Sequence, residues 1–146
     1  MGDFTNPSDL DLWALLEKVK TIAVVGLSPK RYRPSHYVAR NLQHFGYRII
    51  PVYPGVDNVL GERACARLTD ISDPVDLVNV FRAPEHVGDV VEDCLEARMT
   101  ALWLQDGVGN EQASIQAVRA GMTVVMDRCI YRDYMRLIGS SPGYSL

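Results

Sequence analysis

A loop near the start of the chain combines a glycine, hydroxyl groups and cationic side chains in an order suited to phosphate binding. The loop begins at Gly26, directly after the apolar run 21–25, and ends where a helix is expected to begin at Pro34. Backbone N–H groups and a helix N-terminus converge on an anion in loops of this kind. The polar and cationic residues here are Ser28, Lys30, Arg31, Arg33, Ser35 and His36. The pattern predicts a site for a phosphorylated, nucleotide-like molecule.

The same loop departs from the usual dinucleotide-binding pattern. Gly26 stands alone, without the G-x-G-x-x-G spacing. An NAD site also needs an acidic residue at the end of the second strand to hold the ribose 2′-hydroxyl. This strand ends at Tyr53, and the nearest acid, Asp57, lies beyond a Pro-Gly turn. Both departures disfavour NAD, and the cations of the loop favour a ribose that carries its own phosphate. A solvated loop is the alternative explanation of these cations.

Composition places the chain among ordinary globular proteins. It has 146 residues, 47% of them hydrophobic, and a net charge of −3. We therefore expect a single domain over residues 1–146, with a helical segment at 1–20 packing on it. There is no basic surplus to indicate nucleic-acid binding, and the apolar runs are too short for a membrane span. Because the N-terminus lacks a signal-peptide core, we predict a cytoplasmic protein.

Strand and helix patterns alternate along the chain. The predicted strands cover 21–27, 48–53, 76–81, 101–105 and 123–126. Helical patterns precede the first strand, follow the last and lie between the others, except between the second and third, where the stretch is less regular. Because the strands are apolar throughout, we expect burial on both faces. The predicted fold class is α/β: a single Rossmann-like, doubly wound, mainly parallel five-stranded sheet with helices on both faces. Pro51 argues against a fully paired central position for the second strand. Residues 64–69 are expected to form a short strand or turn.

Ligands of doubly wound folds bind beyond the carboxyl ends of the strands. The loops expected there cover 26–33, 53–55, 81–84, 105–108 and 127–129, and they are rich in Pro and Gly with Arg and Lys nearby. The acids on these loops are not paired for acid–base catalysis by spacing alone, and no histidine has a nucleophile beside it. We therefore predict a binding cleft, no catalytic residues and no enzyme activity of its own. The three cysteines show no metal-binding spacing, so no metal site is predicted.

Several segments in order resemble the small CoA-binding proteins of the YccU type, over nearly the whole chain from about Leu12 to Leu137. That family is similar to the N-terminal CoA-binding domain of the succinyl-CoA synthetase α subunit. The segments that carry the resemblance are Val24–Pro29, Arg33–His36, Pro51–Pro54, Leu60–Glu62, Asp76–Arg82, Trp103–Gln105 and Val125–Cys129. The resemblance implies that the cofactor is coenzyme A.

The resemblance also implies which residues bind each part of CoA. Residues 28–31 correspond to the loop that holds the phosphates, and Tyr53 and Pro54 to the turn that borders the adenine. Residues 81–83 flank the ligand, and residues 104–106 contact the pantetheine arm. The predicted cofactor-binding residues are Gly26, Leu27, Ser28, Pro29, Lys30, Arg31, Arg33, Ser35, Tyr53, Pro54, Phe81, Arg82, Ala83, Leu104, Gln105, Asp106, Val108 and Cys129. One departure is Val56, which stands where the synthetase turn carries a lysine.

The expected function is binding of CoA or an acyl-CoA by a non-catalytic carrier, sensor or regulatory module. The chain matches the CoA-binding half of the synthetase and none of its phosphoryl-transfer machinery. Two alternatives remain open: a CoA-ligase component that needs a partner chain, and an NAD(P)-binding redox sensor. The expected partner is CoA or an acyl-CoA, with no nucleic acid or membrane. An exposed sheet edge could support a homodimer, and a separate protein partner is also open.

Cys129 is open to two interpretations. It follows the last strand, so its thiol could face the cleft and form a mixed disulfide with the thiol of CoA. A buried structural cysteine is the simpler interpretation, and the sequence favours it.

Overall fold

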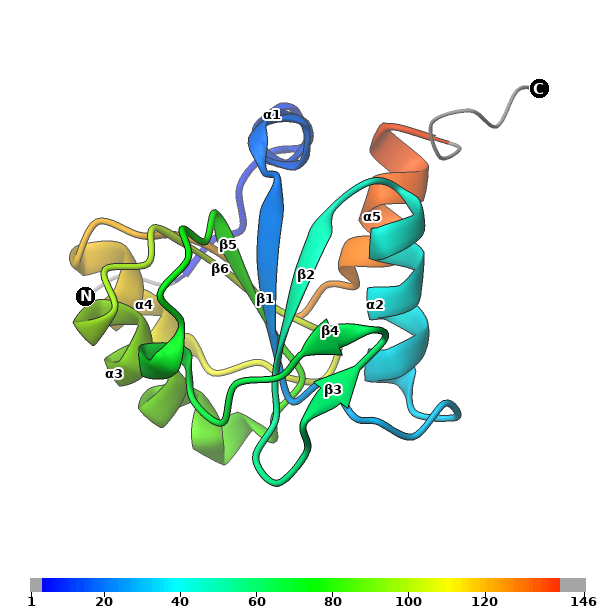
Figure 1. The fold of residues 1–146 in the computed structure, drawn as a ribbon. Coiled ribbons are helices and arrows are strands. Elements are labelled where there is room, and N and C mark those ends of the chain that lie inside the picture. The colour runs from blue at the N-terminus through cyan, green and yellow to red at the C-terminus, as the bar shows by residue number, and fades with distance from the viewer. Residues whose placement is uncertain (1–3, 140–146) are drawn as a thin grey trace.

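The centre of the fold is a five-stranded sheet with strand order β2-β1-β5-β6-β7 (Figure 1). The computed structural model describes residues 4–139. All four neighbouring strand pairs are parallel, which confirms the predicted fold class. The strands of this sheet are β1 (Thr21–Val25), β2 (Arg48–Val52), β5 (Leu77–Val80), β6 (Ala101–Leu104) and β7 (Thr123–Val125).

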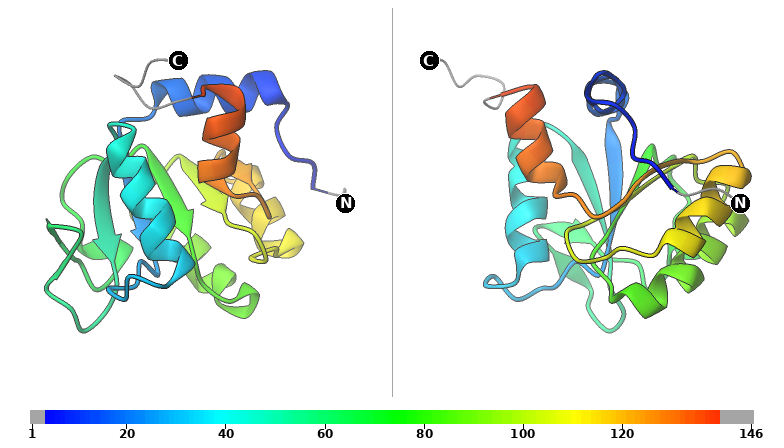
Figure 2. Two further views of the ribbon diagram at one scale, coloured as in Figure 1. Left: turned by 90° about the vertical axis from the view of Figure 1, so that its right-hand side faces the viewer. Right: turned by 180° about the vertical axis from the view of Figure 1, so that it is seen from behind.

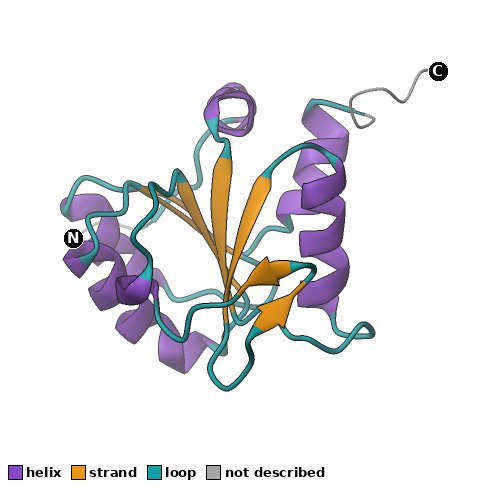
Figure 3. Cartoon of the chain, viewed as in Figure 1, coloured by secondary structure: helices purple, strands orange, loops and turns teal. Residues whose placement is uncertain are grey.

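Helices cover both faces of this sheet (Figures 2 and 3). Helices α2 and α5 lie on one face, α3 and α4 lie on the other, and α1 lies beyond the amino end of β1 (Figure 1). None of the helices in residues 4–139 is both long and apolar enough to cross a membrane. The helices are α1 (Asp9–Lys18), α2 (Pro34–His44), α3 (Val87–Glu96), α4 (Glu111–Arg119) and α5 (Ile130–Leu137), with 3₁₀ turns η1 (Leu68–Asp70) and η2 (Pro84–His86).

Alternate residues of each strand pack into two separate cores. In β1, Ile22 and Val24 belong to the core under α1, α2 and α5, whereas Ala23 and Val25 belong to the core under α3 and α4. All four side chains are buried. Because both faces of the sheet are covered, the strands carry apolar residues without alternation. Packing on both faces and the parallel register together fix where each strand ends relative to its neighbours.

The second strand lies at one edge of the sheet, as Pro51 predicts. The Pro51 carbonyl points away from β1 and accepts a 2.9 Å hydrogen bond from Cys65 N, and Tyr53 N donates to Cys65 O at 2.9 Å. Groups of one strand residue point to the same side, so the missing N–H of Pro51 would also face outward. The proline therefore costs no bond to β1.

A short hairpin that the sequence did not predict follows β2. Strands β3 (Asn58–Val59) and β4 (Glu62–Arg63) pair antiparallel. The two residues between them, Leu60 and Gly61, have φ of 55° and 76°. Two successive positive φ values are typical of the tight hairpin turns that normally use Asn-Gly or Gly-Gly. Because leucine rarely occupies the first position, the turn has a weak sequence signal. Within the predicted strand or turn at 64–69, Cys65 bridges to Val52 and η1 begins at Leu68.

Both edges of the sheet meet another segment of the chain. Beside β7, the Asn6 amide donates to Met126 O at 3.0 Å and accepts from Met126 N at 2.7 Å. Beside β2, the edge is met by Cys65. These contacts lie at the carboxyl ends of the two edge strands and leave the homodimer a prediction. Residues 1–3 and 140–146 of the predicted domain lie outside the described residues.

A buried carboxylate anchors α5, the helix that follows the last strand. Asp133, with a side chain only 4% exposed, accepts hydrogen bonds of 2.6 and 2.8 Å from Arg128 and one of 3.2 Å from Arg136. Arg136 also makes two hydrogen bonds to Asp9 in α1, at 2.8 and 2.9 Å. Aromatic stacking adds to this anchoring, with the Phe45 and Tyr134 ring centroids 3.9 Å apart. The helix α5 is thereby held to α1, to the end of α2 and to the segment that follows β7.

We predict that Asp133→Asn lowers the free energy of unfolding by about 2–3 kcal/mol, because two arginines then lose a desolvated carboxylate. The matched control is Asp73→Asn. Asp73 pairs with Arg48 at 2.6 Å, but its side chain is 50% exposed, so we expect a loss below about 1 kcal/mol. Urea denaturation followed by circular dichroism measures both values. Equal losses in the two variants would show that the Asp133 network does not anchor α5.

Candidate functional site

A cavity of about 660 Å³ opens at the carboxyl ends of the strands. Its walls come from the segments that follow β1, β2, β5, β6 and β7, together with the first turns of α2. This is the position that the doubly wound fold predicts for a ligand. The residues that line the cavity are Gly26, Ser28, Lys30, Arg33, Pro34, Ser35, Val38, Tyr53, Phe81, Arg82, Gln105, Asp106, Val108 and Cys129.

The shape of the cavity depends on Gly26. Its φ is +85°, and a Cβ atom built on it would lie 2.4 Å from the Phe81 carbonyl oxygen. The hydrogen bond from Phe81 N to Val25 O, at 2.8 Å, holds the backbone after β5 beside the end of β1, and the bond from Gly26 N to Val52 O, at 2.9 Å, holds the turn beside β2. No side chain fits between Gly26 and Phe81, so glycine is required here for space as well as for its backbone conformation.

Two buried serines fold the loop after Gly26 against the start of α2. Ser28 N donates to Ser35 Oγ at 3.0 Å, and Lys30 N donates to Ser28 Oγ at 3.1 Å. Both serines are no more than 6% exposed and line the cavity. The N-terminus of α2 has no side-chain capping bond and no acidic residue in its first turn. Its positive end is therefore available to an anion.

The cationic side chains on the cavity wall have no carboxylate partners. Lys30, Arg33 and Arg82 form no ion pair within residues 4–139. The arginines that do form ion pairs there are Arg48, Arg67, Arg128, Arg132 and Arg136. The cavity therefore combines uncompensated positive charge with an open helix N-terminus, an arrangement suited to phosphate groups.

His36 does not add to this positive charge. The side chain is 7% exposed, and its Nδ1 has no hydrogen-bond partner within residues 4–139. Burial lowers the pKa of His36 below its ordinary value of 6.5, and the guanidinium groups of Arg40 and Arg31 lower it further. Protonation thus opposes folding, and the stability contributed by neutral His36 is complete above pH 6.5 and falls as the pH drops below it. The imidazole is neutral at neutral pH.

The opposite end of the cavity is polar but nearly uncharged. Gln105, only 4% exposed, accepts hydrogen bonds at its Oε1 from Asn79 Nδ2 at 3.1 Å and Ile130 N at 2.9 Å. Asp106 is neutralised by two hydrogen bonds of 2.8 and 2.9 Å from Arg132. Cys129 lies beside them at the N-terminus of α5. This end offers an amide and a thiol rather than a site for phosphate.

The other acid on these loops, Asp127, also has a structural partner. Asp127, with φ of 59°, accepts a 2.7 Å hydrogen bond from Gly107 N and so joins the loops after β6 and β7. Within residues 4–139, no group of three or more His, Cys, Asp or Glu side chains is placed to hold a metal ion. The arrangement can bind an anionic ligand and position its uncharged portion near Gln105.

A few of the predicted site residues do not line this cavity. Leu27 and Leu104 are fully buried, each in one of the two cores, so only their backbone groups can face a ligand. Pro29, Arg31 and Ala83 are exposed beside the cavity, and Pro54 borders an adjoining hollow. Sequence analysis missed two wall residues, Pro34 and Val38. Val38 could have been found from its position about one helical turn after Ser35, on the same face of α2.

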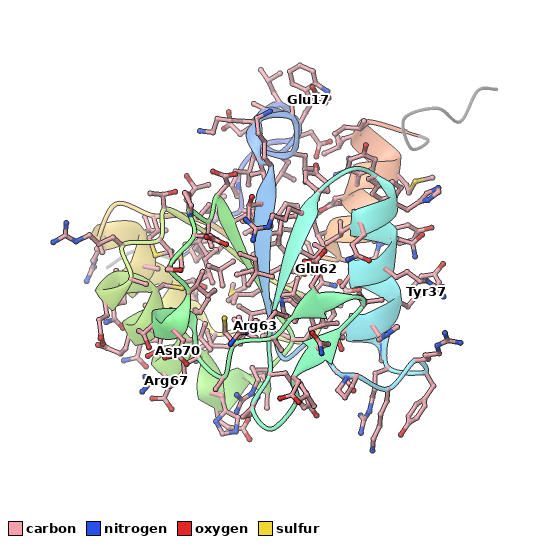
Figure 4. The ribbon with its side chains drawn as sticks, viewed as in Figure 1. Glu17, Tyr37, Glu62, Arg63, Arg67 and Asp70 are labelled. Carbon is pink, nitrogen blue, oxygen red and sulfur yellow. The ribbon has the colours of Figure 1, made fainter. Side chains whose placement is uncertain are left out.

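The adjoining hollow, of about 960 Å³, shares Gly26, Tyr53 and Arg82 with the cavity. Its other side is formed by acidic residues of α3. Arg67 faces this helix and makes a 2.6 Å ion pair with Asp93; Figure 4 labels Arg67 and Asp70 on this side of the sheet. The acidic wall consists of Asp89, Glu92, Asp93 and Glu96. Repulsion from these carboxylates makes the hollow less suited to phosphates than the cavity.

Comparison with known proteins relates most of the chain to one family. The sequence model of a family described as a CoA binding domain matches residues 20–135. The uncharacterized protein YneT of Bacillus subtilis is 44% identical over 125 residues, which cover 86% of this chain and 93% of that protein. A solved structure from Thermus thermophilus has a TM-score of 0.86 and 39% identity, covering 90% of this chain and 99% of that one.

Larger proteins contain a related region. The ADP-forming acetate–CoA ligase of Methanocaldococcus jannaschii is 27% identical over 75 residues, which cover 51% of this chain. Those residues span only 11% of the ligase. The similarity therefore concerns one part of the ligase.

We predict that Gly26→Ala destabilises the protein by about 3–5 kcal/mol, because it adds a clash with the Phe81 carbonyl to the cost of a positive φ. The matched control is Gly55→Ala. Gly55 has a similar φ of +83° but no atom within 4 Å of the added Cβ, so only the conformational cost of about 1–2 kcal/mol should remain. Thermal or urea denaturation compares the two. If Gly55→Ala were as damaging as Gly26→Ala, close packing against Phe81 would not be the reason for the glycine.

Proposed function

Because this chain belongs to the CoA-binding domain family, we propose that it binds coenzyme A or an acyl-CoA in the cavity at the carboxyl ends of its strands. The observation that carries the proposal is the set of unpaired cations around the open N-terminus of α2. Lys30, Arg33 and Arg82 lack carboxylate partners within residues 4–139. CoA supplies a diphosphate and a 3′-phosphate, which would satisfy these cations and the helix N-terminus together.

The sheet order supports one direction for the ligand in the cavity. Tyr53 follows β2 at one edge of the sheet, and Gln105 and Cys129 follow β6 and β7 toward the other edge. With the phosphates beside Ser28 and Lys30, the adenine would extend toward Tyr53, whose ring offers a stacking surface. The pantetheine arm, which carries amides and no charge, would extend toward Gln105. In this orientation the phosphates also avoid the acidic wall along α3.

The proposed role is that of a non-catalytic, cytoplasmic carrier, sensor or regulatory module. The two acids on the cavity loops already have structural roles: Asp106 is paired with Arg132, and Asp127 with Gly107 N. His36 is buried and has a lowered pKa. Within residues 4–139, none of these three side chains forms a hydrogen bond with a hydroxyl or thiol group that it could activate, so the cavity supports binding better than turnover.

A second candidate is a CoA-binding component of a ligase. The observation that favours it is the similarity to one part of the acetate–CoA ligases, 27% over 75 residues in one and 29% over 96 residues in another. In this case a separate chain would supply nucleotide binding and phosphoryl transfer. CoA-dependent turnover that appears only when such a partner is added would favour this candidate over the independent binding module.

Isothermal titration calorimetry with CoA and with NAD tests the proposed function. We expect saturable binding of CoA and much weaker binding of NAD, because Tyr53 is followed by a Pro-Gly turn where an NAD site needs an acid. Tighter binding of NAD or NADP than of CoA would contradict the proposal and favour a redox sensor.

Variants of the cavity cations locate the phosphate site. We predict that Lys30→Ala and Arg33→Ala each weaken CoA binding about 5- to 20-fold and reduce its salt dependence, since each removes a charge-assisted contact. Calorimetry at two salt concentrations measures both effects.

The matched control for these variants is Lys20→Ala. Lys20 is exposed at the amino end of β1, opposite the cavity, so its removal changes the net charge equally but should leave CoA affinity nearly unchanged. Arg31→Ala should have a smaller effect than Arg33→Ala, because Arg31 does not line the cavity. If the Lys20 and Arg33 variants lost the same affinity, the effect would be one of net charge and the phosphates would bind elsewhere.

A further inference from the structure

We propose that Cys129 captures CoA covalently, as a mixed disulfide formed by exchange with a disulfide form of CoA. The inference rests on the proposed function and goes beyond it, because it makes the thiol redox state part of what the protein responds to. It is carried by the position of Cys129 on the cavity wall and by the Gln105 amide beside it, which is held with its donor open to the cavity.

Cys129 occupies a part of the cavity that a pantetheine thiol can reach. It is the N-cap residue of α5, and its side chain forms no capping hydrogen bond. Cys129 is only 8% exposed, and it lines the cavity. The thiol is therefore shielded from bulk solvent but open to a molecule inside the cavity. The sequence left open whether Cys129 is buried or faces the cleft, and in the structure it is buried and also lines the cavity.

Gln105 supplies an independent indication that a ligand reaches this end. Its Oε1 is fixed by Asn79 Nδ2 and Ile130 N, at 3.1 and 2.9 Å. This fixes the amide plane and leaves Nε2, on a side chain only 4% exposed, with no acceptor within residues 4–139. With its Oε1 held in this way, the amide presents Nε2 as a donor to the cavity that Gln105 lines. Amide carbonyls such as those of the pantetheine arm are suitable acceptors for it.

The fixed backbone places this donor and the thiol together. Gln105 Oε1 bonds to Ile130 N, the residue immediately after Cys129. Asp133 holds the start of α5 through Arg128, with hydrogen bonds of 2.6 and 2.8 Å. An arm held by Gln105 therefore ends near Cys129, and its terminal thiol or disulfide is the group presented to the cysteine. Holding the two sulfur atoms in one cavity raises their effective concentration.

The other two cysteines do not share these features. Cys94 is fully buried in the core under α3, and burial raises its pKa to about 12. Cys65 is half-buried at the outer edge of β2, where its backbone bonds to Pro51 and Tyr53, and it lines a different hollow. Cys65 is thus a natural control: a more accessible thiol that does not border the cavity.

The exchange balances without a further oxidant. The Cys129 thiolate attacks one sulfur of the CoA disulfide, a Cys129–CoA disulfide bond forms, and the S–S bond of the CoA disulfide breaks. The second CoA leaves as a thiolate and takes up the proton that Cys129 released. Cys129 is oxidised, one CoA is reduced, and a free thiol can reverse the step by the same exchange.

The test uses the whole chain, incubated with CoA disulfide and analysed by intact mass under denaturing, non-reducing conditions. We expect an adduct of one CoA per chain that is removed by dithiothreitol, and peptide mapping of the unmodified sequence should place it on Cys129. Cys129→Ser should abolish the adduct, and Cys65→Ser should retain it. Formation should be about tenfold or more faster with CoA disulfide than with pantetheine disulfide, which has the same reacting arm without the nucleotide.

Calorimetry with reduced CoA on the same samples tests noncovalent CoA binding separately from disulfide formation. CoA binding without an adduct, or with an adduct only on Cys65, would overturn the disulfide proposal and leave the proposed function intact. Equal rates with CoA disulfide and pantetheine disulfide would likewise overturn it, because the reaction would not use the cavity. No CoA binding at all would overturn both. Since peptide mapping needs no variant, a folding defect in Cys129→Ser leaves the test decisive.

Discussion

The contact between Gly26 and the Phe81 carbonyl is the constraint on which the site depends. Hydrogen bonds from Gly26 N to Val52 O and from Phe81 N to Val25 O hold the carboxyl ends of the adjacent strands β2, β1 and β5 side by side. The turn that follows β1 therefore needs a glycine, because a Cβ atom at Gly26 would lie 2.4 Å from the Phe81 carbonyl oxygen. The start of α2, the two serines and the cations all take their positions from this turn.

Charge in this protein is distributed in two different ways. Around α5, arginines and carboxylates form pairs, including the buried Asp133, and these pairs hold one element to another. Around the start of α2, Lys30 and Arg33 have no carboxylate within residues 4–139, and the helix lacks a side-chain cap. A capping residue or an acid there would stabilise the free protein. A site that forgoes local stabilisation in this way is one expected to bind an anion.

The parallel sheet could be predicted from the sequence because several independent patterns indicate it. Uninterrupted apolar strands, helical patterns between most of them and the position of Pro51 all indicated the same parallel fold, and the structure agrees. The β3–β4 hairpin was missed since Leu60 adopts a positive φ that its residue type does not announce. That conformation is set by the surrounding structure and not by local preference.

The site was less predictable than the fold, for a geometric reason. Position along a loop does not tell which way a side chain points. Leu27 and Leu104 are adjacent to wall residues yet are buried in the cores, whereas Val38, which reads as a core residue, also lines the cavity. The orientation of the Gln105 amide could not be foreseen either, because it depends on Asn79 and Ile130, which are distant in sequence.

The most direct test of the central claim is an NMR titration of the isotopically labelled protein with CoA, following the backbone amide signals. The account predicts that the largest shifts cluster in residues 26–36 and in the segments 105–108 and 129–132, which surround the cavity. Shifts confined to α3 and the adjoining acidic hollow, or no shifts at saturating CoA, would contradict it.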